Sequence, residues 1–120
     1  MDLATNDLNQ IRTFLARNGA PADYEISSAL RGATPTGCAI ETWLGVKVSM
    51  ICFRSDKPGN ASSDLWLFVS RRGSIAKSPA NSEPTFVTVN GATSANWTSD
   101  NSVYTLVTAD GDAQFLKKYL

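Results

Sequence analysis

The stretch that decides the fold is VKVSMICF, residues Val46–Phe53. Its first half alternates apolar and polar residues, as in a strand with one buried face, and its second half is apolar on both faces. The later run LWLFV, Leu65–Val69, is apolar throughout, which is typical of a strand in the middle of a sheet. Neither run approaches the roughly 18 residues of a membrane span. We therefore expect a sheet built around these two strands.

Four further segments have strand-like patterns. One precedes the Leu44-Gly45 turn, and two are joined by Asn90-Gly91, a strong hairpin signal. Short turns join many of these strands and no helical crossover separates them, so the sheet is expected to be antiparallel. The four segments are Cys38–Trp43, Phe86–Val89, Ala92–Trp97 and Val103–Thr108.

Helical patterns lie at the two ends of the chain. Asn6 or Asp7 can cap a helix that runs to about Asn18, and a shorter helix is expected over Glu25–Leu30. Asp110 or Asp112 can cap a terminal helix. The prediction is a single α+β domain: a helical segment over 1–32, an antiparallel sheet over 36–108 and a helix over 110–120. We expect five to six strands, with the N- and C-terminal helices packed on one face.

The composition excludes several classes of function. The 120 residues include 11 basic and 11 acidic side chains, so the net charge is zero, which disfavours nucleic acid as a partner. The chain has no histidine, which removes His-based catalytic triads and His metal sites. We predict a protein that is not an enzyme, with no cofactor and no metal.

Three short patterns have simpler interpretations than the chemistry they suggest. Ser74-Ile75-Ala76-Lys77 fits the Ser-x-x-Lys pattern of acyl-serine enzymes, but the second Lys-Thr-Gly element is missing, so we interpret it as a loop. Asp110-Gly111-Asp112 is interpreted as a turn and helix cap rather than a calcium site. Arg71 and Arg72 are interpreted as solvated loop residues.

The two cysteines lie on neighbouring strands of one predicted hairpin, so the strand register decides whether they meet. With a three-residue loop, Cys38 faces Cys52 and a disulfide can form. With a two-residue loop, Cys38 faces Ile51 and the thiols lie on opposite faces. Gly45 in the second loop position suits a type II turn, which favours the second register. Two buried free thiols and a structural disulfide both remain open.

The two central strands carry apolar residues on both faces, which is more than one helical layer can cover. Ile51 and Phe53 face one way in the first strand, and Trp66 and Phe68 face one way in the second. We interpret these four residues as a candidate interaction face for a protein partner.

A set of short motifs runs through the strands and the C-terminal segment: Gly37-Cys38, Trp43-Leu44-Gly45, Val48–Phe53, Leu67-Phe68-Val69, Gly91, Ala95-Asn96-Trp97, Tyr104–Val107, Gly111-Asp112 and Leu116. With these residues the chain resembles the outer domain of a bacterial family of membrane-anchored, anti-sigma-factor-type regulators. The resemblance covers about Gly37–Leu120 and implies no catalytic or ligand-binding residue. In that family a cytoplasmic zinc-binding module and one membrane helix precede the domain.

The resemblance implies a fragment that lies in the periplasm, linked to the membrane through an upstream span. In that oxidising compartment a Cys38–Cys52 disulfide is favoured. The expected function is a non-enzymatic sensor or regulatory domain that binds a protein or a small ligand. The alternatives are a structural domain that forms homodimers, pairing through the two central strands, and a small enzyme with an unrecognised site. No signal peptide is seen at Met1, so a cytoplasmic location is the alternative for the compartment.

Overall fold

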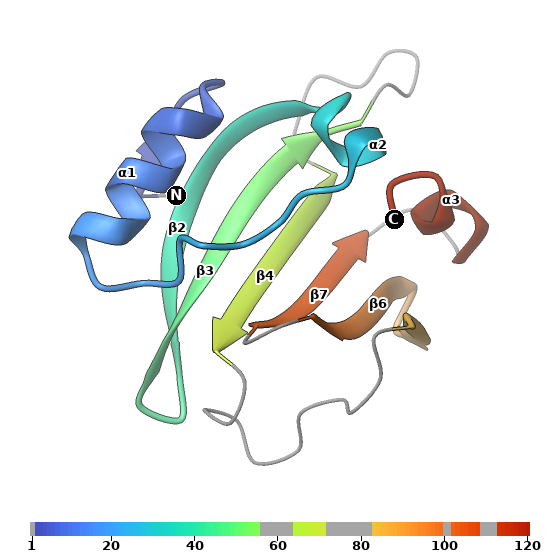
Figure 1. Ribbon diagram of the computed structural model, residues 1–120. Coiled ribbons are helices and arrows are strands. Elements are labelled where there is room, and N and C mark those ends of the chain that lie inside the picture. The colour runs from blue at the N-terminus through green and yellow to red at the C-terminus, as the bar shows by residue number, and fades with distance from the viewer. Residues whose placement is uncertain (1, 56–63, 72–82, 100–101, 109–112) are drawn as a thin grey trace.

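The computed structural model describes residues 2–55, 64–71, 83–99, 102–108 and 113–120. Seven strands form one antiparallel sheet in the order β1-β2-β3-β4-β7-β6-β5 (Figure 1). The strands are β1 (Leu3–Ala4), β2 (Thr34–Trp43), β3 (Val46–Arg54), β4 (Leu65–Arg71), β5 (Thr85–Val89), β6 (Ala92–Ser99) and β7 (Ser102–Thr108). The helices are α1 (Leu8–Arg17), α2 (Ser28–Arg31) and α3 (Ala113–Lys117).

The expected sheet of five to six strands with terminal helices packed as a layer on one face is wrong. The sheet has seven strands, because Leu3 and Ala4 pair with Cys38 and Gly37 as an additional edge strand. The three described helices are short, with 10, 4 and 5 residues. Much of the covering comes instead from segment 18–27, an extended chain without helix or strand.

The sheet is assembled from two hairpin units that meet at β4 and β7. After β4 the chain reaches the far edge of the sheet at β5 and returns inward through β6 to β7. Leu67 in β4 lies opposite Leu106 in β7, and Val69 lies opposite Tyr104. These pairs place the apolar β4 strand in the centre, as its sequence predicts.

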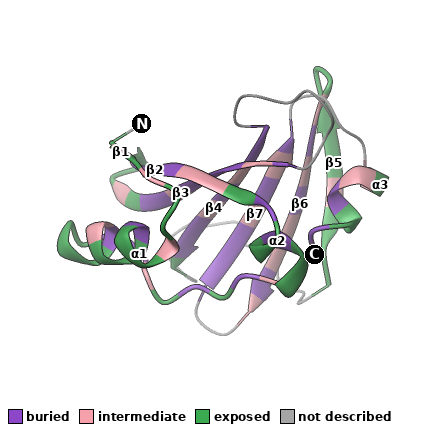
Figure 2. Cartoon of the chain, turned by 90° about the horizontal axis from the view of Figure 1, so that it is seen from above, coloured by how far each residue is buried: buried purple, intermediate pink, exposed green. Residues whose placement is uncertain are grey.

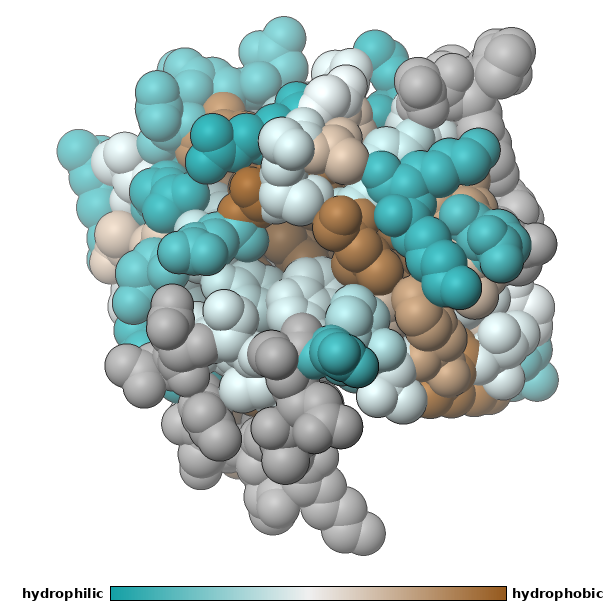
Figure 3. Space-filling view, turned by 45° about the vertical axis from the view of Figure 1, so that its right-hand side comes forward, coloured by the Kyte–Doolittle hydropathy of each residue, from teal (hydrophilic) through white to brown (hydrophobic). Residues whose placement is uncertain are grey.

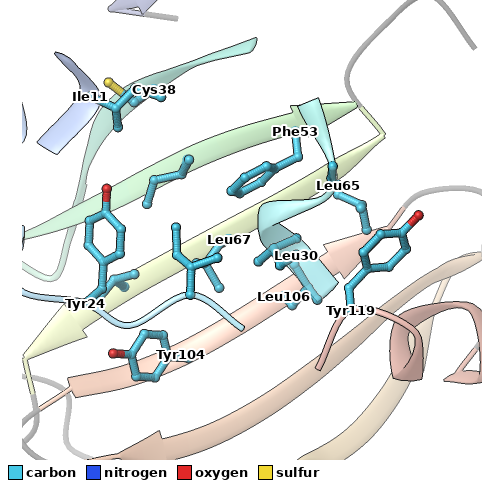
Figure 4. Packing of buried hydrophobic residues seen from close by; sticks show 14 of the residues in the cluster. Ile11, Tyr24, Leu30, Cys38, Phe53, Leu65, Leu67, Tyr104, Leu106 and Tyr119 are labelled. Carbon is cyan, nitrogen blue, oxygen red and sulfur yellow. The ribbon is translucent and has the colours of Figure 1, made fainter. Parts of the chain in front are cut away.

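Each central strand presents one side to α1, segment 18–27 and α2, which lie on the same side of the sheet (Figure 2). We call this side the inner face. Figure 4 shows its core, where side chains of segment 18–27 and α2 meet those of β3, β4 and β7. The opposite side is called the outer face. Inner-face core residues of the strands include Cys38, Ile51, Phe53, Leu65, Leu67, Val69, Ala95, Tyr104 and Leu106.

Segment 18–27, called the strap below, is held to the inner face by side chains. Lys47 Nζ donates to the Asn18 carbonyl at 2.6 Å, and the Ser49 hydroxyl donates to the Pro21 carbonyl. From the other side, Arg12 of α1 donates to the carbonyls of Ala22 and Tyr24. These hydrogen bonds fix the position of the strap over the inner face, although the strap forms no helix or strand.

The β2–β3 hairpin turns on Leu44 and Gly45, which have φ values of 52° and 80°. Positive φ at both positions defines a type I′ turn, so the type II turn expected from Gly45 is wrong. The β5–β6 turn has the same form, with Asn90 at 52° and Gly91 at 83°. Leucine in the left-handed region is strained, whereas asparagine adopts it readily.

The strained turn gives a stability prediction. Replacing Leu44, which is 88% exposed, by asparagine should raise the free energy of unfolding by about 0.5–1 kcal/mol, because the strain is relieved and no packing is lost. Urea denaturation followed by circular dichroism measures this difference. The reverse exchange, Asn90→Leu, is the matched control and should lower stability. A stability loss in Leu44→Asn would contradict the turn geometry.

Candidate functional site

The four residues of the predicted interaction face do not lie on one face. Ile51 and Phe53 point to the inner face and have no exposed surface. Their partners in β4 are Leu67 and Leu65, so Trp66 and Phe68 point to the outer face, where they are partly exposed. Strand alternation divides the set in two, because adjacent antiparallel partners share a face.

The outer face carries one aromatic contact near its end. The rings of Trp43 and Phe68 lie 5.2 Å apart between centroids, and Trp43 is 36% exposed. Val48 and Cys52 of β3 point to the same outer face, but Val48 is fully buried and Cys52 is 2% exposed, so only part of this face is accessible.

The alternative of a homodimer that pairs through the two central strands fails as edge pairing, because β3 and β4 each have a neighbouring strand on both sides.

The cysteines are both buried, free thiols on opposite faces. Cys38 lies opposite Ile51, and Gly37 lies opposite Cys52, which is the register of the two-residue loop. The Cys38–Cys52 disulfide that the family resemblance favours is therefore not formed. Burial raises the pKa of Cys38 to about 11, and burial also raises the pKa of Cys52.

The thiols give a chemical prediction. In the folded protein at pH 8, both cysteines should react with iodoacetamide at least about 100-fold more slowly than in urea, because the thiolate is suppressed and buried. After exposure to air, the intact mass of the protein should still be that of a chain with two free thiols. A native disulfide in non-reducing peptide mapping would contradict this register.

The raised pKa of Cys38 also makes the stability depend on pH. Its contribution to the free energy of unfolding is fully present below pH 9 and is lost as the pH rises towards 11.

Several predicted features lie wholly or partly outside the described residues: the Ser74–Lys77 segment, Arg72, and the Asp110-Gly111-Asp112 turn. Arg71 ends β4 and is exposed. Within the described ranges, no group of three or more Cys, Asp or Glu residues is arranged to hold a metal ion. No helix in that part of the chain is long and apolar enough to cross a membrane.

A cleft of about 380 Å³ opens on the inner face, between the end of the strap and the ends of β6 and β7. This volume is in the range of small-molecule sites. We call it the Trp97 cleft. Figure 3 shows hydrophobic surface around a hollow near the middle of this side of the molecule. The residues that line the Trp97 cleft are Glu25, Ile26, Ser27, Pro84, Trp97, Ser99, Tyr104 and Leu120.

One wall of the cleft is a pair of stacked aromatic rings. Trp97 of β6 and Tyr104 of β7 are cross-strand partners, and their rings lie 5.2 Å apart with an angle of 9° between their planes. The backbone N–H of Glu25 donates to the Tyr104 hydroxyl oxygen at 2.9 Å. This bond fixes the Tyr104 ring and joins the strap to the sheet at the cleft.

The strap and the chain end supply the opposite wall. The Ser27 hydroxyl donates to the Tyr119 carbonyl at 2.5 Å and accepts from the Leu30 N–H at 3.0 Å, so it caps α2 and anchors the segment after α3. Ile26 is 8% exposed and supplies apolar wall. The side chain of Glu25 is exposed, and it is the charged residue among those that line the cleft.

A larger groove of about 510 Å³ runs between α1 and β1, but its character is different. Its lining combines the half-buried Leu3 and Phe14 with four exposed polar residues, Asn9, Gln10, Thr13 and Arg17. It lacks the pair of stacked rings and the buried apolar wall that the Trp97 cleft has. The Trp97 cleft is therefore the better candidate for a ligand site.

The sequence pattern did not identify this cleft. Trp97 and Tyr104 were recognised only as strand residues, since their stacking depends on the β6–β7 register. Glu25 was expected inside a helix, whereas it lies in the extended strap. In comparisons with known proteins, no family model, no curated protein and no solved structure matches this chain.

Proposed function

We propose that this chain is a non-enzymatic sensor domain that binds a small organic cation in the Trp97 cleft. The observation that carries the proposal is the stacked Trp97–Tyr104 pair in a cleft whose charged lining residue is Glu25. Aromatic rings attract cations through their electron-rich faces, and a carboxylate attracts them directly. The aromatic pair and the carboxylate both favour a positively charged ligand, and the apolar wall favours a ligand with a hydrocarbon part.

The connection from the cleft to α1 supports a regulatory role. Glu25 and Ser27 line the cleft, and Ala22 and Tyr24 precede Glu25 in the strap. The guanidinium group of Arg12 in α1 donates hydrogen bonds to the carbonyl oxygens of Ala22 and Tyr24, at 2.9 Å and 3.2 Å. Its central carbon also lies 4.4 Å from the centroid of the Tyr24 ring. A ligand that shifts the strap therefore acts on α1 through short, direct contacts.

Ligand binding is tested with a matched pair of probes. Benzylammonium should bind and change the fluorescence of Trp97, whereas benzyl alcohol, which keeps the ring and loses the charge, should bind at least about tenfold more weakly. Glu25→Gln should weaken benzylammonium binding by about threefold to tenfold and leave benzyl alcohol unchanged.

The control is Glu41→Gln, which removes an exposed carboxylate on β2, outside the cleft. It should bind benzylammonium as the unmodified protein does. Equal binding of the charged and neutral probes would refute the preference for cations. Absence of chemical-shift changes at Trp97 and Tyr104 with either probe would refute the cleft as the site.

We further propose that the domain acts outside the cytoplasmic membrane as part of a larger bacterial regulator. This placement rests on the resemblance of residues 37–120 to the outer domains of anti-sigma-factor-type proteins. The prediction is that the gene encodes an apolar stretch of about 20 residues before the codon for Met1, preceded by a His- and Cys-rich helical module. Sequencing the gene upstream checks this. A ribosome-binding site directly before Met1 would favour a cytoplasmic sensor instead.

A further inference from the structure

The two edges of the sheet are protected to very different extents. At the β1 edge only two residues pair, and Asp2 adds a charged side chain whose carboxylate accepts from the Ile40 N–H at 2.8 Å. Short strands and charged side chains are the usual protection against pairing with another chain. At the other edge β5 pairs with β6 over five residues, from Thr85 to Val89.

The β5 edge lacks these protective features. The sequence Thr85-Phe86-Val87-Thr88-Val89 contains no charge and no proline, and it is rich in β-branched residues. Val87 is 47% exposed and Val89 is 61% exposed, and Figure 2 shows β5 as a largely exposed margin of the sheet. Lys117 Nζ lies 5.5 Å from the centroid of the Phe86 ring, whose side chain points to the inner face.

The hairpin turn determines which backbone groups point away from the sheet. Val89 and Ala92 flank the two-residue turn and form a hydrogen-bonded pair of the ladder, and such pairs alternate along antiparallel strands. The backbone N–H and C=O groups of Val87 are thereby directed at β6. Those of Phe86 and Thr88 point outward, and in the described part of the chain no further strand pairs with β5.

We propose that β5 is a dimerisation edge that pairs antiparallel with β5 of a second copy, with Val87 on the two-fold axis. In this register Phe86 lies opposite Thr88 of the second copy, and Thr88 lies opposite Phe86 of the second copy. The outward groups of both residues then form four backbone hydrogen bonds. Registers centred on Phe86 or Thr88 leave part of these groups unpaired.

The choice of a second copy rests on self-complementarity. The register brings Val87 against its own symmetry mate on the outer face and Thr85 against Val89, so no charges oppose each other. Glu83 falls opposite Gly91, which also avoids a like-charge contact. Since one strand pair buries less than the about 1,200 Å² of a standard interface, the dimer should be weak and concentration-dependent.

Sedimentation equilibrium between about 10 µM and about 1 mM tests the dimer. The protein should associate reversibly, and Val87→Lys should weaken association at least about tenfold, because two ammonium groups then face each other on the axis. Leu44→Lys makes the same change at an exposed leucine of the other hairpin and should leave association unchanged. Circular dichroism checks that both variants are folded.

A charge exchange tests the register itself. Val87→Lys and Val87→Glu should each be monomeric alone, and an equimolar mixture should form a heterodimer, since Lys then faces Glu across the axis. A protein that stays monomeric up to about 1 mM would overturn the proposal. So would a dimer that Val87→Lys does not weaken, or a mixture that fails to associate. The result does not depend on any ligand in the Trp97 cleft.

Discussion

The structure depends on how the strap, residues 18–27, satisfies its backbone while it crosses the inner face. A segment outside helices and strands cannot pair its own N–H and C=O groups, and leaving them buried and unpaired is costly. Side chains of neighbouring elements provide the partners: Lys47 and Ser49 from β3, Arg12 from α1 and Tyr104 from β7. One of these bonds, from the Glu25 N–H to the Tyr104 hydroxyl oxygen, also joins the strap to the sheet at the cleft.

Periodicity predicted the elements better than their arrangement. Six of the seven strands and α1 lie where the alternation and capping patterns place them, because those signals are local. The two-residue strand β1 is too short to leave a pattern, and the order in which β7, rather than β5, lies beside β4 depends on contacts between distant segments. The strap was expected to be partly helical, because Ile26, Ala29 and Leu30 have helical spacing, although helix α2 starts only at Ser28.

The sites were harder to predict than the strands, since each depends on a register. One residue more or less in the Leu44-Gly45 turn exchanges the faces of every side chain on β2, and so decides whether Cys38 meets Cys52. The cleft combines Glu25 from the strap, Trp97 from β6 and Leu120 from the chain end. No local pattern joins residues so far apart in the sequence.

The distribution of exposed apolar residues along β5 is not explained by the needs of the fold. The inner face of this strand requires Phe86, which packs against the core beside Ala95. On the outer face, polar residues at positions 87 and 89 would satisfy the alternation of an edge strand equally well and would protect it from association. The chain has valine at both positions, and no charge nearby in the strand. An unprotected edge of this kind tends to cause uncontrolled aggregation. The two exposed valines on it are best explained by a specific partner strand that pairs with the edge.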